Sequence, residues 1–348
     1  MKILLRALES NVERKQEWFS KPICGLLQKK GVQFGFQLSC PVDFSRMLDC
    51  PLAVHLPGGF ANQWQGQGER ISEDLQEVLD PIIQQKEKLL YVVLHGLRVN
   101  KGRPDAEGAE LYISDVSAED YVSAFKRMVK LVEQLMDLDL PIAVENVAFT
   151  NFHRDNEGVF HPKTFLDLRI PVLVSDMERL RKETGCKLVL DIEHLAFALK
   201  FANRRNIYAR LPDCIPQGCS NQEAMVLVNR GIFIRKDRVP VVPYILSLEE
   251  EIKKVQTEIF HISGCCSNGE YSEIKPWGQA KKVVGSHDQI TDSCNFRELL
   301  AGMLRPNSII VPEVAGPDMN PCHAQRPDDA EEKSFLVLCE IIEQELGV

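Results

Sequence analysis

Acidic and imidazole side chains occur where apolar runs of this sequence end. The apolar run 188–190 ends in Asp191, and His194 follows three residues later. Carboxylate oxygens and imidazole nitrogens are both good metal ligands. A short apolar run of this kind is typical of a strand buried on both faces. The stretch 187–194 therefore predicts metal-binding side chains at the end of a buried strand.

The same arrangement recurs along the chain. A single histidine or glutamate at a strand end is more often a hydrogen-bonded surface residue, a satisfied core imidazole or a partner of a helix dipole. Recurrence at every predicted strand end after the first favours one shared cluster, in which crowded carboxylates would repel one another without cations between them. The candidate ligands are His55, His95, Glu145, Asp191, His194, His261, His287 and Glu313, with Asp288 beside His287.

The residues between these positions predict alternating strands and helices. The predicted strands are 31–39, 52–55, 89–95, 141–145, 187–191, 259–261, a weak strand near 283–284, and 308–311. Helices are predicted over 72–88, 117–136 and 175–184, from Ser247 onward, and over 295–304 and 329–346. Such alternation implies parallel strands joined by crossover helices. Eight units predict an α/β fold, a closed (β/α)8 TIM barrel, whose C-terminal strand ends meet at one mouth.

We expect one domain over residues 1–348, with an N-terminal helical extension at 1–30 and a long insertion at 195–257 after the fifth strand. Within 200–238 the insertion has eight basic and three acidic residues, in a chain whose net charge is −9. It is predicted to lie over the mouth as a lid and to meet an anionic substrate. The predicted substrate-binding residues are Arg98, Arg204, Arg205 and Asp288.

Composition limits the function classes. The negative net charge disfavours broad electrostatic binding of nucleic acid, although a local basic patch leaves such a substrate open. No apolar run approaches the roughly 20 residues needed to span a bilayer, and no secretory signal is evident. The 11 cysteines are scattered, which favours reduced thiols in the cytoplasm. Only the adjacent pair Cys265-Cys266 stands out.

The order of the candidate ligands is that of a known group of barrels. Two histidines, a glutamate, Asp-x-x-His, a further histidine, a turn containing histidine and a final glutamate resemble the xylose isomerase-like TIM-barrel superfamily. The closest resemblance is to its endonuclease IV-type metal-dependent branch, because of the histidines on the second and third predicted strands. The resemblance covers about residues 31–316.

This resemblance implies specific metal ligands. His55, His95 and Glu145 would hold one ion, and Glu145 would bridge to a second ion held with Asp191, His261 and Glu313. His194 and His287 would belong to a third site. The branch has Asp-x-His there, whereas this chain has Gly285 in place of the aspartate, with Asp288 as a substitute. One to three divalent ions are expected, with zinc favoured over manganese and iron.

The leading functional prediction is a metal-dependent phosphoesterase in which a metal-activated water attacks an anionic substrate, with Glu145, Asp191 and Glu313 as catalytic residues. A one-ion sugar isomerase or epimerase is an alternative, in which Glu145 and Glu313 exchange protons with a sugar-like molecule. A multinuclear iron enzyme that modifies peptide cysteines has overlapping ligands. A barrel that only binds a partner is disfavoured, because the ligand set is nearly complete.

Overall fold

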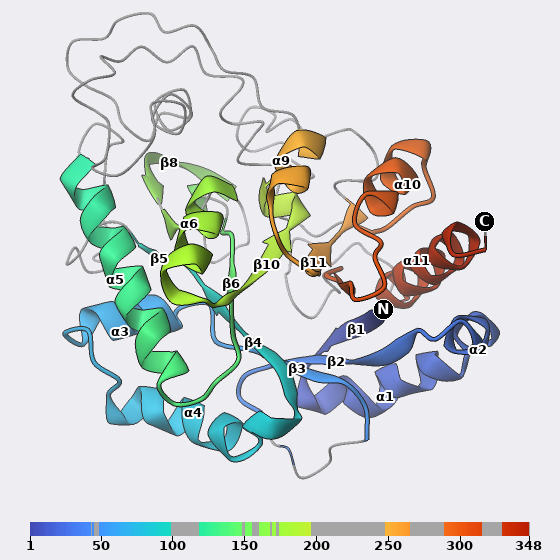
Figure 1. Cartoon of the computed structure of the whole chain (residues 1–348), viewed down its shortest axis with the longest axis horizontal. Helices are drawn as coiled ribbons and strands as arrows, with labels where there is room; N and C mark the ends of the chain where they lie inside the picture. Colours follow the sequence, from blue (N-terminus) through green and yellow to red (C-terminus); the bar gives the residue numbers. More distant parts are fainter. Residues whose placement is uncertain are drawn as a thin grey trace, which may run out of the picture.

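Eight parallel strands close into a barrel in the computed structural model of the chain (Figure 1). Residues 1–42, 44, 49–98, 118–147, 150–154, 160–167, 169–171, 174–195, 248–264, 289–314 and 329–347 are described. In order around the barrel the strands are β1 (Lys2–Ala7), β2 (Gln33–Ser39), β3 (Leu52–His55), β4 (Leu89–His95), β6 (Ile142–Glu145), β10 (Lys187–Asp191), β11 (Ile259–Ile262) and β12 (Ile309–Pro312). Because β12 pairs with β1, the sheet has no open edge. The predicted (β/α)8 barrel is confirmed.

Helices follow the strands around the outside of the barrel (Figure 1). They are α1 (Val12–Gln16), α2 (Pro22–Lys29), α3 (Phe60–Gly66), α4 (Glu73–Gln84), α5 (Ala118–Met136), α6 (Val174–Thr184), α9 (Leu248–Lys254), α10 (Cys294–Ala301) and α11 (Ala330–Glu345), with short 3-10 turns at Glu9–Asn11, Glu17–Ser20 and Lys86–Lys88. Serine hydroxyls cap two of the predicted helices, since Ser72 accepts from Leu75 N–H and Ser293 from Phe296 N–H. The helices predicted from apolar spacing all occur, whereas α3 was not predicted.

Two small antiparallel sheets lie beyond the C-terminal ends of β4 and β6. One pairs β5 (Leu97–Arg98) with β9 (Arg169–Ile170), and the other pairs β7 (Thr150–Arg154) with β8 (Phe160–Asp167). Neither sheet was predicted from the sequence. Both follow strands that carry candidate ligands, so they add structure at the mouth of the barrel.

The N-terminal segment differs from its prediction. Residues 1–30 were expected to form a helical extension outside the barrel, but residues 2–7 form β1, which pairs with β2 and β12. The buried Lys15 of α1 forms an ion pair with Glu331 of α11. The N-terminal segment is therefore held by strand pairing through β1 and by this ion pair through α1. The run 3–5 is too short for its strand character to stand out beside the helical residues that follow.

The prediction of a seventh strand near 283–284 falls outside the described residues. In the barrel, β11 pairs directly with β12 in parallel, with His261 opposite Val311. No strand therefore lies between them, and the position assigned to the weak strand is wrong. The segment predicted as the eighth strand, β12, is still the eighth in chain order, because β1 precedes the strand that was predicted as the first.

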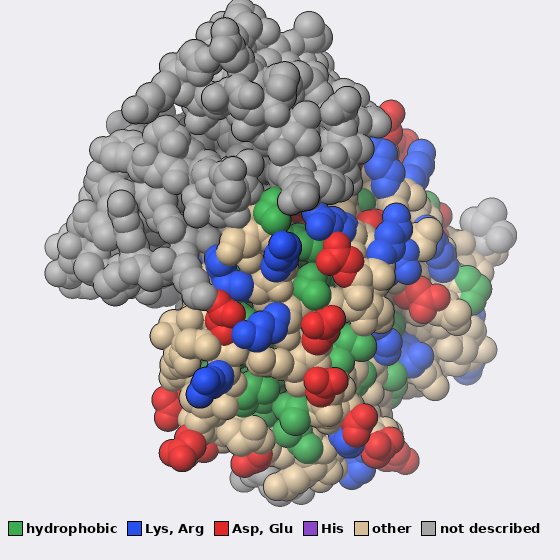
Figure 2. All heavy atoms as spheres, turned by 60° about the vertical axis from the view of Figure 1, so that its left-hand side comes forward, with side chains coloured by type: hydrophobic (Ala, Val, Ile, Leu, Met, Phe, Trp, Pro, Cys, Tyr) green, Lys and Arg blue, Asp and Glu red, His purple; other side chains and the backbone are tan. Residues whose placement is uncertain are grey.

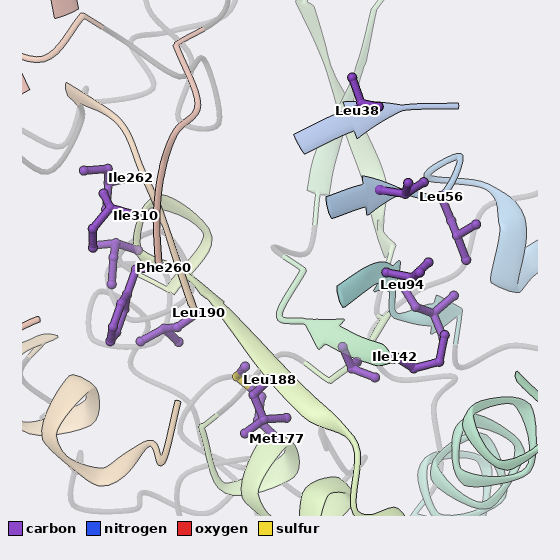
Figure 3. Close-up of a cluster of buried hydrophobic side chains, with 14 of the residues drawn as sticks. Leu38, Leu56, Leu94, Ile142, Met177, Leu188, Leu190, Phe260, Ile262 and Ile310 are labelled. Atoms are coloured by element: carbon purple, nitrogen blue, oxygen red, sulfur yellow. The ribbon is translucent and has the colours of Figure 1, made fainter. Parts of the chain in front are cut away.

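Strand residues alternate between two hydrophobic layers, because successive side chains point to opposite faces. Outward side chains pack against the helices, as Leu188 of β10 does beside Met177 of α6 (Figure 3). Inward side chains fill the barrel with a separate cluster consisting of Leu4, Ala53, Tyr91, Val93, Ala143, Val189, Ile259, Ile309 and Val311. The barrel is thus a packed core that supports the mouth, as is usual for this fold.

The described surface carries charges of both signs. On the face shown in Figure 2, Lys and Arg side chains are interspersed with Asp and Glu and with scattered hydrophobic side chains. A duplex would meet mixed charge on the described part of this face. Among the described helices, none combines the length and the apolar character that a transmembrane segment requires.

Candidate metal centre

The inward side chains at the C-terminal ends of six barrel strands converge on one site. Each lies two residues beyond an inward apolar or small residue, as Glu145 lies beyond Ala143 and Asp191 beyond Val189. Because side chains two residues apart on a strand lie on the same face, these residues also point into the barrel, at its open end above the apolar layer. They are His55 of β3, His95 of β4, Glu145 of β6, Asp191 of β10, His261 of β11 and Glu313 directly after β12.

Glu145 lies between two groups of candidate ligands. Its Oε2 is 3.3 Å from His55 Nε2 and 3.1 Å from His95 Nε2. Its Oε1 faces the other way and is 3.5 Å from His261 Nδ1. Glu145 is 1% exposed, so neither oxygen is solvated by bulk water. One carboxylate thus presents a different oxygen to each group.

Three residues from neighbouring strands form the first group, defined as His55, His95 and Glu145. Their ligand atoms all lie within 4.8 Å of one another. His55 Nδ1 is 2.7 Å from the Leu56 carbonyl and donates its proton to it, which leaves Nε2 as the nitrogen that faces Glu145. The two imidazole rings meet edge to face, with centroids 4.6 Å apart.

Four buried residues form the second group, which consists of Glu145, Asp191, His261 and Glu313. Their ligand atoms also lie within 4.8 Å of one another. His261 Nδ1 is 3.2 Å from Glu313 Oε1. The group brings three carboxylates together inside the barrel, and Arg6 offsets part of that charge because its Nη1 is 3.0 Å from Glu313 Oε1.

Divalent cations fit both groups. His55 Nε2, Glu145 Oε1 and His261 Nδ1 are buried and form no aligned hydrogen bond within the described part of the chain. Buried polar atoms normally have a partner, because leaving them without one costs free energy. Coordination would give each of these atoms a partner. Mixed nitrogen and carboxylate ligands suit zinc, manganese and iron.

The two groups differ in the protonation of their histidines. Burial lowers the pKa of His95 to about 4 despite the nearby Glu145, so this imidazole is neutral near pH 7. Burial also opposes protonation of His261, but Glu313 and Glu145 outweigh it and raise its pKa to about 9. Burial tends to raise the pKa of Glu145, whereas His95 and His261 hold it well below its usual range. A proton on His261 Nδ1 therefore occupies the place that a metal ion would take.

Asn146 fixes the relative position of β6 and β10 at the site. Its side-chain amide donates to the Asp191 carbonyl at 3.0 Å and accepts from the Asp191 N–H at 2.7 Å. Its own carbonyl accepts from His194 Nδ1 at 2.9 Å. The amide thus continues the strand pairing for one residue past Glu145. Asn146 was not predicted as a site residue, although it directly follows a predicted ligand.

His194 lies beside the second group without belonging to it. Burial disfavours its charged form, but Asp191 and Glu145 raise its pKa above the ordinary value. Its Nδ1 is 3.5 Å from Glu145 Oε1 and 3.6 Å from Asp191 Oδ2. Because Nδ1 already donates to Asn146, a cation would have to bind through Nε2. The third site that the resemblance implies also needs His287, which lies outside the described residues.

The other predicted site residues are placed only in part. Arg98 lies on β5, three residues beyond His95, and its backbone N–H donates to Asn62 Oδ1 at 2.9 Å. Its contact with substrate stays a prediction. The following predicted residues lie outside the described residues: Arg204, Arg205, Cys265, Cys266 and Asp288, together with most of the insertion 195–257.

Three further side chains at the site were missed by the sequence analysis. Arg6 was missed because β1 was not recognised. Gln37 and Tyr91 lie on predicted strands, and both side chains are inside the barrel, where Tyr91 O–H donates to Gln37 Oε1 at 3.0 Å. A neutral polar residue within an apolar strand, facing inward by the period of two, was the available signal for both.

Comparison with known proteins finds likeness in structure alone. No protein-family model and no curated protein matches the chain. A D-tagatose 3-epimerase-like protein is 14% identical, with 99% of this chain and 98% of that chain covered and a TM-score of 0.43. The structural neighbours of this chain are xylose isomerase-like barrels.

Two other structural neighbours carry names of different kinds of protein. Endonuclease IV from Thermus thermophilus is 12% identical, with 99% of each chain covered and a TM-score of 0.40. A xylose isomerase domain protein from Alicyclobacillus acidocaldarius subsp. acidocaldarius is 11% identical over 99% of this chain and 88% of that chain, with a TM-score of 0.36. Likeness at this level does not choose between hydrolysis and epimerisation.

Proposed function

We propose that the chain is a metal-dependent hydrolase that cleaves an anionic phosphoester at a centre of two adjacent divalent ions. The observation that carries this proposal is the position of Glu145. One of its oxygens faces His55 and His95, and the other faces His261. A carboxylate shared in this way suits two ions held close together.

The two groups supply different sets of metal ligands. His55 and His95 add two nitrogen ligands to Glu145, and Asp191, His261 and Glu313 add two carboxylates and one nitrogen. Bound divalent ions would lower the pKa of a water molecule and neutralise the charge of a phosphoester. Asp191 and Glu313 are suited to orient that water, because their oxygens lie beside Glu145. The apolar layer below excludes bulk water from the inner side of the site.

The substrate that fits this proposal is small and anionic. Arg98 is three residues beyond His95 and is our candidate for binding a phosphoryl oxygen, together with Arg204 and Arg205 of the insertion. Nucleic acid is not favoured, since the net charge of −9 and the mixed charges of the face in Figure 2 offer a duplex little attraction.

One observation favours a second function, an isomerase or epimerase of a sugar-like molecule. The second group has four ligands and could hold one ion without His55 or His95. Glu145 and Glu313 would then be available to exchange protons with a substrate. This function leaves unexplained why two further histidines point at Glu145, and we therefore rank it second.

The test compares both activities in the same preparation. Protein loaded with zinc or manganese is assayed on bis(4-nitrophenyl) phosphate and on a panel of ketohexoses, alongside the variants Glu145→Gln and His55→Ala. We expect phosphodiester cleavage that both variants lose. Epimerisation that survives in His55→Ala would instead support the one-ion function. Activity that requires bound iron and oxygen, with peptide cysteines as substrate, would support the iron enzyme.

A further inference from the structure

A buried amide connects two members of the second ligand group. Gln37 lies on β2 and is 0% exposed. Its Oε1 is 3.0 Å from Tyr91 Oη and 3.0 Å from His261 Nε2. Its Nε2 donates to Glu313 Oε1 over 3.5 Å. One side chain therefore touches an imidazole and a carboxylate that come from β11 and from the residue after β12.

The contacts of Gln37 determine how its amide is oriented. A carboxylate accepts hydrogen bonds only, so the amide N–H2 must face Glu313. The amide oxygen then faces Tyr91 and His261. Burial and the charges of Glu313 and Glu145 raise the pKa of Tyr91 well above its ordinary value, so its hydroxyl keeps its proton and donates it. Tyr91 is thus a donor to the amide oxygen, and His261 is the other partner of that oxygen.

This orientation fixes the tautomer of His261. Because an amide oxygen cannot donate, His261 Nε2 must carry a hydrogen to bond with it. The other nitrogen, Nδ1, faces the two carboxylates, at 3.2 Å from Glu313 Oε1 and 3.5 Å from Glu145 Oε1. Once it has lost its own proton, Nδ1 presents a lone pair at the position where the second group would hold a cation.

We propose that Gln37 is a positioning residue of the metal centre, which holds His261 in the Nε2–H tautomer and Glu313 in place so that both face the same ion. This inference rests on the two-ion centre of the proposed function. Histidines that bind metals commonly donate their second N–H to an outer partner, and loss of that partner costs about 10–100-fold in metal affinity or activity. Gln37 differs from a simple acceptor in that its amide nitrogen also holds a second ligand.

The first test separates hydrogen bonding from packing. Gln37→Glu keeps an acceptor for Tyr91 and His261 but loses the donor to Glu313, whereas Gln37→Met keeps the approximate volume and loses both the acceptor and the donor. We expect Gln37→Met to bind zinc about 10–100-fold more weakly in a chelator competition. Gln37→Glu should bind more tightly than Gln37→Met but more weakly than the wild type, because it keeps the contact with His261 and loses the one with Glu313. A role in packing alone predicts the reverse order, because methionine fills the space and a glutamate adds buried charge.

A matched control measures the general effect of losing a buried amide. Gln65 of α3 is also buried, and its side-chain oxygen can accept from the Arg127 guanidinium, away from both ligand groups. Gln65→Met is expected to lower the melting temperature without changing zinc affinity. If Gln37→Met and Gln65→Met bind zinc equally well, Gln37 has no positioning role.

A measurement on the wild-type protein keeps the inference testable if the Gln37 variants do not fold. In zinc-loaded protein labelled with 15N-histidine, we expect His261 to carry a slowly exchanging proton on Nε2 and to bind zinc through Nδ1. A proton on Nδ1 would overturn the inference and leave the proposed function standing. Unchanged zinc content in His261→Ala would overturn both.

Discussion

Among single residues, Glu145 is the one carboxylate that both ligand groups share. Glu145 is buried, each of its oxygens faces a different group of ligands, and its pKa is held well below the usual range by His95 and His261 against the effect of burial. It is therefore ionised near pH 7. Leaving a buried anion without a positive partner costs several kcal/mol, so cations beside Glu145 would stabilise it.

Replacing Glu145 with Gln tests this dependence directly. The amide keeps the shape of the side chain but removes the charge common to both groups, so we expect at least one metal ion per chain to be lost and phosphodiesterase activity to be abolished. The barrel should still fold, as judged by circular dichroism. Glu178→Gln is the matched control, since Glu178 pairs with Arg181 on the surface helix α6. Equal metal content in both variants would contradict the role of Glu145.

Metal binding at the second group should depend on pH. His261 has a pKa of about 9 in the metal-free chain and must lose its Nδ1 proton before it binds a cation. Zinc affinity is therefore expected to rise about tenfold per pH unit up to about pH 9 and then to level off. His95, with its pKa lowered to about 4, adds no slope above about pH 5. Chelator competition between pH 6.5 and 9 measures the slope, and a constant affinity would contradict this assignment.

At the scale of the element, the sequence predicts the strand ends well because each is an apolar run followed by a ligand. Strands β3, β4, β6, β10 and β11 begin and end within about two residues of their predicted bounds. Short apolar runs of this length are typical of strands buried on both faces of a parallel sheet. The candidate ligands of these strands could therefore be named from their position alone.

The sequence predicts less where strand character is weak or where a contact joins distant strands. The run 3–5 is short and is followed by helical residues, so β1 was missed and Arg6 with it. Gln37 and Tyr91 meet only because β2 and β4 both turn these side chains inward, and the spacing along the chain does not reveal that contact. The loops predicted to supply Arg204 and His287 have no periodic pattern to position them.

The pairing of β2 with the segment before β3 leaves no room for a side chain at Gly35. A Cβ at this position would lie 2.0 Å from the Pro51 carbonyl oxygen. Gly35→Ala must move backbone, and we expect it to lower the free energy of unfolding by about 1–3 kcal/mol. Gly25→Ala is the control, because Gly25 lies within α2, a Cβ there would have nothing within 4 Å, and the variant should gain about 0.5–1 kcal/mol. Urea unfolding measures both, and equal effects would contradict the tight strand contact.

In the molecule as a whole, the candidate ligands come from six of the eight barrel strands or from the residue directly after one of them. They come from β3, β4, β6, β10 and β11 and from the residue after β12. Ions bound there would bridge strands that are far apart in sequence, while the carboxylates repel one another without them. Metal binding and stability of the barrel are therefore expected to be coupled.

Removal of metal should lower the stability of the protein. A ligand present at 100 times its dissociation constant stabilises the folded state by about 2.7 kcal/mol. We expect the wild type to lose an amount of this order when dialysed against a chelator, whereas Glu145→Gln should change little because it binds metal weakly from the start. Thermal unfolding with and without zinc measures the difference. An identical melting temperature for metal-free and zinc-loaded wild type would contradict the coupling.

Two ions that share Glu145 would give the protein a defined metal content, which elemental analysis measures. Elemental analysis would be applied to untagged protein purified without chelators and to the double variant His55→Ala/His95→Ala. We predict at least two divalent ions per wild-type chain and one fewer in the double variant. A single ion in the wild type that the double variant retains would contradict the two-ion centre and the hydrolase built on it.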